Sequence, residues 1–241
     1  MMILITLLNA PANKSIFLTL CPQLMPAKER YVGYQDEMIN AIRTHKFKQA
    51  ALMADQITLL EINPEDSPEQ NFLLPYYFLI LGKYSALTTM ISTSYDRRTN
   101  SYYDHYIKAE AWLGLREYFK ARNEFVIARS LAAEQVCVLF GLMKANIAVG
   151  NKVEAKQLLT KLHSKASARW IDAFLALVDL KRGDEVSAKT IAEEFVIIMS
   201  DPLDECEAIP NLDFVSNYLD NSGFKNEARL VAKACLRIKE K

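Results

Sequence analysis

The chain has 241 residues, of which 51% are hydrophobic and 24% are charged, and its 29 basic and 29 acidic residues balance. This composition excludes a disordered chain, and the lack of net positive charge argues against binding to nucleic acid, which requires a positive face. Only 7 Gly and 8 Pro are present. A β-rich domain of this size needs more turn residues, so an all-α fold is expected.

The N-terminal region contains two apolar runs, residues 1–8 and 16–21, and each is too short to span a bilayer. No basic region precedes the first run, as a secretory signal would require, so we expect a cytoplasmic protein without an integral membrane span. Export or membrane association is the alternative, because Ala10-Pro11-Ala12 resembles a cleavage site. We divide the chain into an apolar N-terminal extension or cap, residues 1–27, and one helical domain, residues 28–241.

After this extension the chain reads as six pairs of helices. Met25 opens the polar stretch before the first pair and is an alternative start of the protein, since Pro26 suits the first turn of a helix. Short breaks with turn chemistry, such as Gly150-Asn151 and Gly183-Asp184, separate the helices of a pair. The predicted spans are 28–43 with 46–61, 68–82 with 84–93, 101–116 with 118–132, 134–149 with 151–163, 166–182 with 184–199, and 208–221 with 224–238.

A small residue recurs early in the second helix of most pairs, where it lets the two helices approach closely. Three of these pivot alanines are 34 and 33 residues apart, which is the period of stacked helix-turn-helix repeats. Leu87 replaces alanine in the second pair, and the step before the last alanine is longer, so residues 201–207 are predicted to bulge between the last two pairs. The pivots are Ala50, Ala121, Ala155, Ala188 and Ala228.

These units resemble the tetratricopeptide repeat (TPR) family, with the closest match over residues 102–195. The third unit carries the small and aromatic residues of the pattern, namely Ala109, Trp112, Tyr118, Ala121, Phe125 and Ala128. The usual proline after the second helix is missing from units three and four, where Ala133 and Lys165 stand nearby. The resemblance implies an α-α superhelix of about six repeats, in which the first helix of each pair lines a concave groove.

Aligning the units on their pivots predicts which side chains line that groove. Aromatic residues dominate its middle, and aromatic anchors with a few charges are typical of protein-binding surfaces. The alternative is that several of these rings pack between repeats. The predicted protein-binding residues are Phe72, Tyr76, Tyr103, Tyr106, Glu110, Phe140, Lys144, Trp170 and Lys181, with Leu79 and Cys137 on the same face.

The best-known ligand of the family is the acidic C-terminus of heat-shock chaperones, which a clamp of Lys and Asn binds. The corresponding places in the first repeat hold Gln35 and Ile39, and those in the second hold Phe72 and Leu73. Because the clamp is missing, the expected partner is a protein or peptide segment with apolar anchors.

Nothing in the sequence points to a cofactor or metal. The four cysteines form no CxxC pair and the three histidines are scattered, so we expect reduced, mostly buried thiols and no metal site. The stretch from Tyr95 to Tyr106 combines four tyrosines with Arg97 and Arg98. It is a recognition edge, an arginine–aromatic contact for nucleic acid or, as we prefer because no other basic patch extends it, a loop followed by the start of a helix.

The usual nucleophile and phosphate motifs are absent, which disfavours an enzyme. The leading hypothesis is a non-enzymatic binding module that holds an apolar or amphipathic protein segment, as a scaffold or a client-specific chaperone. Analogy alone suggests a bacterial secretion or pilus accessory protein. The alternative is a self-associating structural protein, a homo-oligomer in which another copy covers the groove or an end face. Residues 1–24 are a further candidate occupant of the groove.

Overall fold

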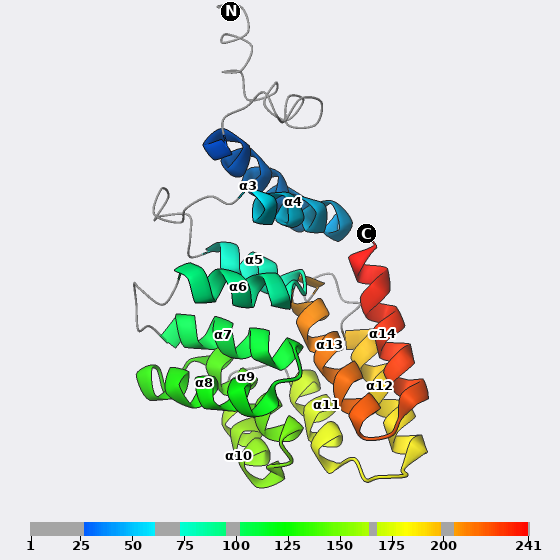
Figure 1. The fold of residues 1–241 in the computed structure, drawn as a ribbon. Helices are drawn as coiled ribbons and strands as arrows, with labels where there is room; N and C mark the ends of the chain where they lie inside the picture. The colour runs from blue at the N-terminus through cyan, green and yellow to red at the C-terminus, as the bar shows by residue number, and fades with distance from the viewer. Residues whose placement is uncertain (1–26, 61–72, 95–101, 164–167, 199–204, 241) are drawn as a thin grey trace, which may run out of the picture. The chain divides into compact units, whose positions relative to one another are not determined.

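The computed structural model describes residues 27–60, 73–94, 102–163, 168–198 and 205–240, and all the regular structure within these ranges is helical (Figure 1). The expected all-α class is therefore confirmed for the part of the chain described. The chain forms two compact units, the smaller from residues 1–77 with 240–241 and the larger from residues 78–239. The proposed boundary at residue 27 coincides with the start of the first described helix and stays a prediction.

The smaller unit contains a pair of packed helices, α3 (Ala27–Arg43) and α4 (Phe47–Leu59), and the first part of α5 (Leu73–Ile80). The turn between α3 and α4 places His45 in the left-handed region at φ 55°. The backbone N–H of Lys46 then donates to the carbonyl of Ala41 at 2.8 Å, which closes the end of α3. The buried side of α4 repeats at helical spacing, through Phe47, Ala50, Ala54 and Ile57.

The larger unit contains the remaining helices, and their ends lie within three residues of the predicted ends. One prediction was wrong in detail: Glu205–Glu207 belong to a helix, so they are not part of a bulge before the last pair. The helices are α6 (Tyr84–Ser94), α7 (Tyr102–Gly114), α8 (Tyr118–Leu131), α9 (Val136–Ala148), α10 (Lys152–Leu162), α11 (Ala168–Asp179), α12 (Glu185–Ile198), α13 (Glu205–Asn221) and α14 (Lys225–Lys239).

The turn between α9 and α10 shows why glycine stands at the predicted breaks. Gly150 has φ 81°, in the left-handed region that strains other residues. Its N–H donates to the carbonyl of Ile147 and the N–H of Asn151 donates to that of Asn146, which satisfies the end of α9. The Asn151 side chain then accepts from the Glu154 N–H and begins α10. Stop and start signals thus occupy two adjacent residues.

The pivot residues are buried between helices, as the close approach of paired helices requires. Ala50, Ala121, Ala155 and Ala188 are fully buried, and Ala228 is 5% exposed. Helices that follow one another pack together from α6 to α14, and first or second helices of neighbouring pairs also meet, as in α7 with α9 and α12 with α14. Packing of adjacent helical pairs is therefore confirmed.

The contacts of α13 go beyond a simple stack of neighbours, because this helix also packs against α7. Repeat proteins are usually held by contacts between adjacent repeats only. Here the first helix of the last pair contacts the first helix of a pair three units earlier (Figure 1). This contact determines which part of the predicted groove stays accessible.

Candidate functional site

The first helices of three successive pairs, α7, α9 and α11, carry equivalent residues in three rows that are one helical turn apart. The rows follow from the steps between pivot alanines. From the N-terminal toward the C-terminal ends of these helices, they are Tyr103, Cys137 and Trp170 (the open row); Tyr106, Phe140 and Ala173 (the middle row); and Glu110, Lys144 and Leu177 (the inner row).

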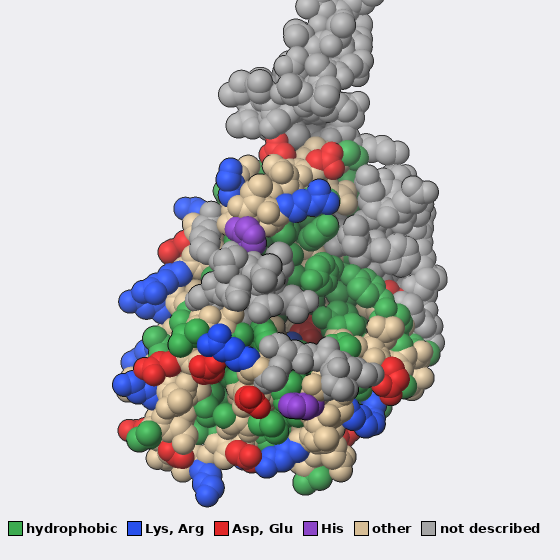
Figure 2. Space-filling model, turned by 180° about the vertical axis from the view of Figure 1, so that it is seen from behind, with side chains coloured by type: hydrophobic (Ala, Val, Ile, Leu, Met, Phe, Trp, Pro, Cys, Tyr) green, Lys and Arg blue, Asp and Glu red, His purple; other side chains and the backbone are tan. Residues whose placement is uncertain are grey.

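Exposure falls from the open row to the inner row. In the open row Cys137 is exposed, and Tyr103 and Trp170 are partly exposed. In the inner row Glu110 is 4% and Lys144 is 3% exposed. The inner surface is therefore closed toward the C-terminal ends of these helices and accessible toward their N-terminal ends. Figure 2 shows one face of the molecule, on which many hydrophobic side chains are exposed among scattered charged ones.

Helix α13 covers the inner row. The Lys144 ammonium donates to Glu110 Oε2 at 2.9 Å and to Asn211 Oδ1 of α13 at 3.2 Å. One turn further along α13, the Phe214 ring lies 6.4 Å from the Phe174 ring of α11. Glu110 and Lys144, the only oppositely charged residues of the three rows, thus neutralise each other, and the Asn211 amide accepts a further hydrogen bond from Lys144. Buried charges require such partners.

Two further groups of contacts hold α13 in place. At its middle, the Tyr84 hydroxyl donates to Asp213 Oδ2 at 3.0 Å and Lys239 approaches the same oxygen at 3.2 Å. At its end, Arg116 donates to Asn217 Oδ1 at 2.5 Å, and the Asn221 amide donates to a tyrosine hydroxyl on α8. These bonds connect α13 to α6, α14 and the α7–α8 turn, so its position is fixed from several sides.

The groups around Asp213, which include Tyr84 and the Cys235 thiol 3.2 Å from Asp213 Oδ1, are expected to make the protein less stable at alkaline pH. Burial, and after it the Asp213 charge, raises the pKa of the Cys235 thiol from 9.0 to about 12 and raises the pKa of Tyr84 well above 10.0. Above about pH 9 the unfolded chain releases the Cys235 proton while the folded chain keeps it, so the free energy of unfolding falls by about 1.4 kcal/mol per pH unit. Ionisation of Tyr84 in the unfolded chain adds to this slope above about pH 10.

Urea denaturation between about pH 8 and pH 10.5 measures the slope. In Cys235→Ala the free energy of unfolding should fall less steeply with pH, because the thiol is gone. Cys137→Ala removes an exposed thiol and should keep the wild-type slope. Equal slopes for Cys235→Ala and wild type would show that this thiol ionises alike in both states.

Aromatic rings beneath the open row form a contiguous cluster. The Phe140 ring lies 5.9 Å from Trp170 and 5.0 Å from Phe174, in both cases edge to face. Phe174 in turn contacts Phe195 at 5.0 Å. Phe140 and Trp170 thus pack between repeats, as the alternative interpretation has it, and both rings also stay partly exposed.

Of the other predicted site residues, Phe72, Tyr76 and Lys181 do not join these rows, and Tyr106 joins them but is buried. Phe72 lies outside the described residues, and Tyr76 belongs to the smaller unit, where its ring is 6.3 Å from that of Tyr77. Lys181 is exposed and lies beyond the end of α11, in the connection to α12. Tyr106 is in the middle row but is only 9% exposed, with its ring 6.2 Å from Phe125.

The side chains of α13 that reach the inner surface, Asn211 and Phe214, were not predicted as part of it. The long step of 40 residues between Ala188 and Ala228 was the available signal. It shows that the last pair departs from the regular stacking, but it does not show the direction in which the pair turns.

The expectation of mostly buried thiols is met at one cysteine and not at another. Cys235 is buried, but Cys137 is exposed, so the prediction of a buried thiol was wrong for Cys137. Cys21 lies outside the described residues. Within the described ranges, no three His, Cys, Asp or Glu side chains are grouped as metal ligands. The same ranges contain no helix with the length and apolar character needed to span a membrane.

Comparison of the sequence with protein-family models gave no match, and comparisons with curated proteins and with solved structures gave none either. The likeness to tetratricopeptide repeats therefore rests on the residues quoted above.

Proposed function

We propose that this chain is a non-enzymatic protein-binding module of TPR-like repeats, and that its open row binds an amphipathic helix of a protein partner. What supports this proposal is α13, a helix that already occupies the neighbouring part of the same inner surface. A surface that packs one helix through apolar, aromatic and amide contacts has the shape and chemistry for a second one. The partner would serve as the client of a chaperone or as a component held by a scaffold.

The open row supplies the anchors. Tyr103 and Trp170 offer large amphipathic rings at low entropic cost, and the Cys137 thiol between them is small and polarizable. Aromatic residues of this kind carry most of the energy in protein interfaces. An apolar side chain of the partner would pack against the exposed parts of these two rings, while the buried inner row is left to α13.

Tyr103→Ala is expected to weaken partner binding by about 2 kcal/mol, or roughly thirtyfold, as for an aromatic anchor. Tyr103 is partly exposed, so helical content should stay that of the wild type. Tyr106 is unsuitable for this test because its ring is buried against Phe125. The partner is first identified by mass spectrometry of proteins retained by the wild-type chain, and its affinity is then measured with both purified proteins by calorimetry.

The matched control is Phe119→Ala, since Phe119 is an aromatic residue of α8 that is 75% exposed and lies outside the three rows. It should bind the partner with wild-type affinity. If Tyr103→Ala also binds with wild-type affinity, the open row is not the binding surface. If the retained partner is a second copy of the chain, light scattering at several concentrations will show a self-associating protein.

A further inference from the structure

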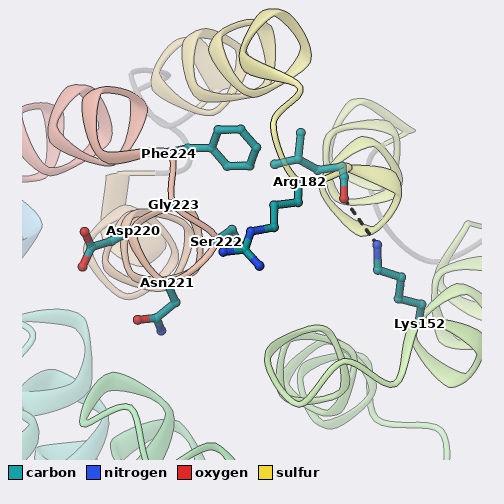
Figure 3. A pocket seen from close by; sticks show the side chains of 8 residues that line it. Lys152, Arg182, Asp220, Asn221, Ser222, Gly223 and Phe224 are labelled. Atoms are coloured by element: carbon teal, nitrogen blue, oxygen red, sulfur yellow. Dashed lines mark hydrogen bonds between the residues drawn. The ribbon is translucent and has the colours of Figure 1, made fainter.

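A separate hollow of about 440 Å³ lies where three helix connections of the larger unit meet. Its walls come from the first residue of α10, from the α11–α12 connection, and from the end of α13 with the following turn (Figure 3). This volume is within the range of small-molecule sites. The lining residues are Lys152, Leu180, Arg182, Asp220, Asn221, Ser222, Gly223 and Phe224.

Both basic side chains of the hollow can face a ligand. In Figure 3 the guanidinium of Arg182 extends toward Ser222, across the space between the connections. The Lys152 ammonium donates one hydrogen bond to the Leu180 carbonyl at 3.3 Å and keeps two N–H groups for other acceptors. In the described ranges no carboxylate lies within ion-pair distance of Arg182, which is exposed.

The other polar groups of the hollow are engaged elsewhere. Asp220, its one carboxylate, is 3.7 Å from Arg116, and in Figure 3 it points away from Arg182. The Asn221 amide donates to the Tyr118 hydroxyl at 3.0 Å. The backbone N–H groups of Gly223 and Phe224 donate to carbonyls at the end of α13. Two cations thus face the space without a matching acidic group.

The remaining wall is apolar. Leu180 is 7% and Phe224 is 5% exposed, so each side chain contributes a small apolar surface at the back of the hollow. A guanidinium binds a carboxylate or phosphate through two parallel hydrogen bonds, and an ammonium adds a point charge. The combination suits an oxyanion attached to an apolar group.

We propose that this hollow binds a small organic anion, with the carboxylate or phosphate group between Arg182 and Lys152 and the apolar part against Leu180 and Phe224. The site is independent of the open row, because the two share no residue. Binding should weaken as ionic strength rises, since both cations are exposed to solvent.

Benzoate, phenyl phosphate and inorganic phosphate are the probes, each titrated into the full-length chain and followed by amide NMR shifts. Benzoate or phenyl phosphate is expected to shift the amides of residues 180–182 and 222–224, and the tighter of the two identifies the preferred oxyanion. Arg182→Gln should weaken binding about tenfold or more, as should Lys152→Gln. Inorganic phosphate, which lacks the apolar part, should bind more weakly than phenyl phosphate.

The matched control is Lys181→Gln, which removes an exposed cation beside Arg182 that does not line the hollow. Its affinity should equal that of the wild type. The proposal is overturned if neither organic anion binds at millimolar concentration. It is equally overturned if Arg182→Gln binds as tightly as the wild type, or if Lys181→Gln weakens binding as much as Arg182→Gln does.

Discussion

Replacing Lys144 by methionine is expected to lower the free energy of unfolding by about 3–5 kcal/mol. The Glu110 carboxylate would lose the ammonium 2.9 Å away while staying beneath α13, where its side chain is 5% exposed. Asn211 would lose its donor at the same time. A buried charge without a partner keeps the full cost of leaving water, which is why removal of one partner is more harmful than removal of both. Urea denaturation of the variant and the wild type measures the difference.

Two variants test this explanation. Glu110→Met combined with Lys144→Met removes both charges and should recover most of the lost stability. Lys108→Met removes the lysine of a more exposed pair, Lys108–Glu124 at 3.1 Å, and should cost at most about 1 kcal/mol. If Lys144→Met costs no more than Lys108→Met, the buried pair does not contribute as argued.

Gly141→Ala is expected to destabilise the protein by about 1–3 kcal/mol, although alanine is the better helix former by about 1 kcal/mol. Gly141 lies in the middle of α9, and a β-carbon there would overlap two ring atoms of Phe125 and approach Glu110 Oε1 to 3.0 Å. Phe125 is fully buried and cannot move into solvent. Thermal unfolding followed by circular dichroism measures the loss.

Phe125→Leu should partly rescue Gly141→Ala, because the smaller side chain leaves room for the methyl group. The two single changes and the double change then form a cycle with a favourable coupling energy. Gly150→Ala is the comparison, since no atom lies within 4 Å of its added β-carbon and only the left-handed φ of 81° opposes it. If the double variant is as unstable as the sum of the two single changes, the clash with Phe125 is not the cause.

The residues that begin, end and join helices were readable from the sequence. Gly150, Gly183 and Gly223 all adopt left-handed φ at predicted breaks. The buried pivot alanines, such as Ala121 and Ala155, mark where the two helices of a pair pack together. Local backbone preference and the size of one side chain determine these features, and both are properties of short segments.

The pairing of Glu110 with Lys144 was partly readable as well. They are 34 residues apart, at equivalent positions in two adjacent repeats, so the repeat register places them on facing helices with opposite charge. The burial of the pair was not predictable in the same way. It depends on α13, which meets this surface through contacts between residues 40 positions apart, as in Phe174–Phe214, and 67 positions apart, as in Lys144–Asn211. No local pattern specifies the angle between one pair of helices and the next. The sum of these angles determines whether the last pair can contact the third pair.

The contacts of α13 also have a consequence for the order of folding during synthesis. Its bonds to α6, α9 and the α7–α8 turn connect residues separated by 67 positions, as in Lys144–Asn211, to 129 positions, as in Tyr84–Asp213. Most pairs of a repeat protein can form as soon as their neighbour has left the ribosome, whereas contacts of this range require nearly the whole chain and slow the final step. Until α13 is made, the Glu110 and Lys144 charges stay hydrated. Folding of the last repeat therefore completes the core. In a chain that is truncated before the last repeat, the inner row would stay exposed to water.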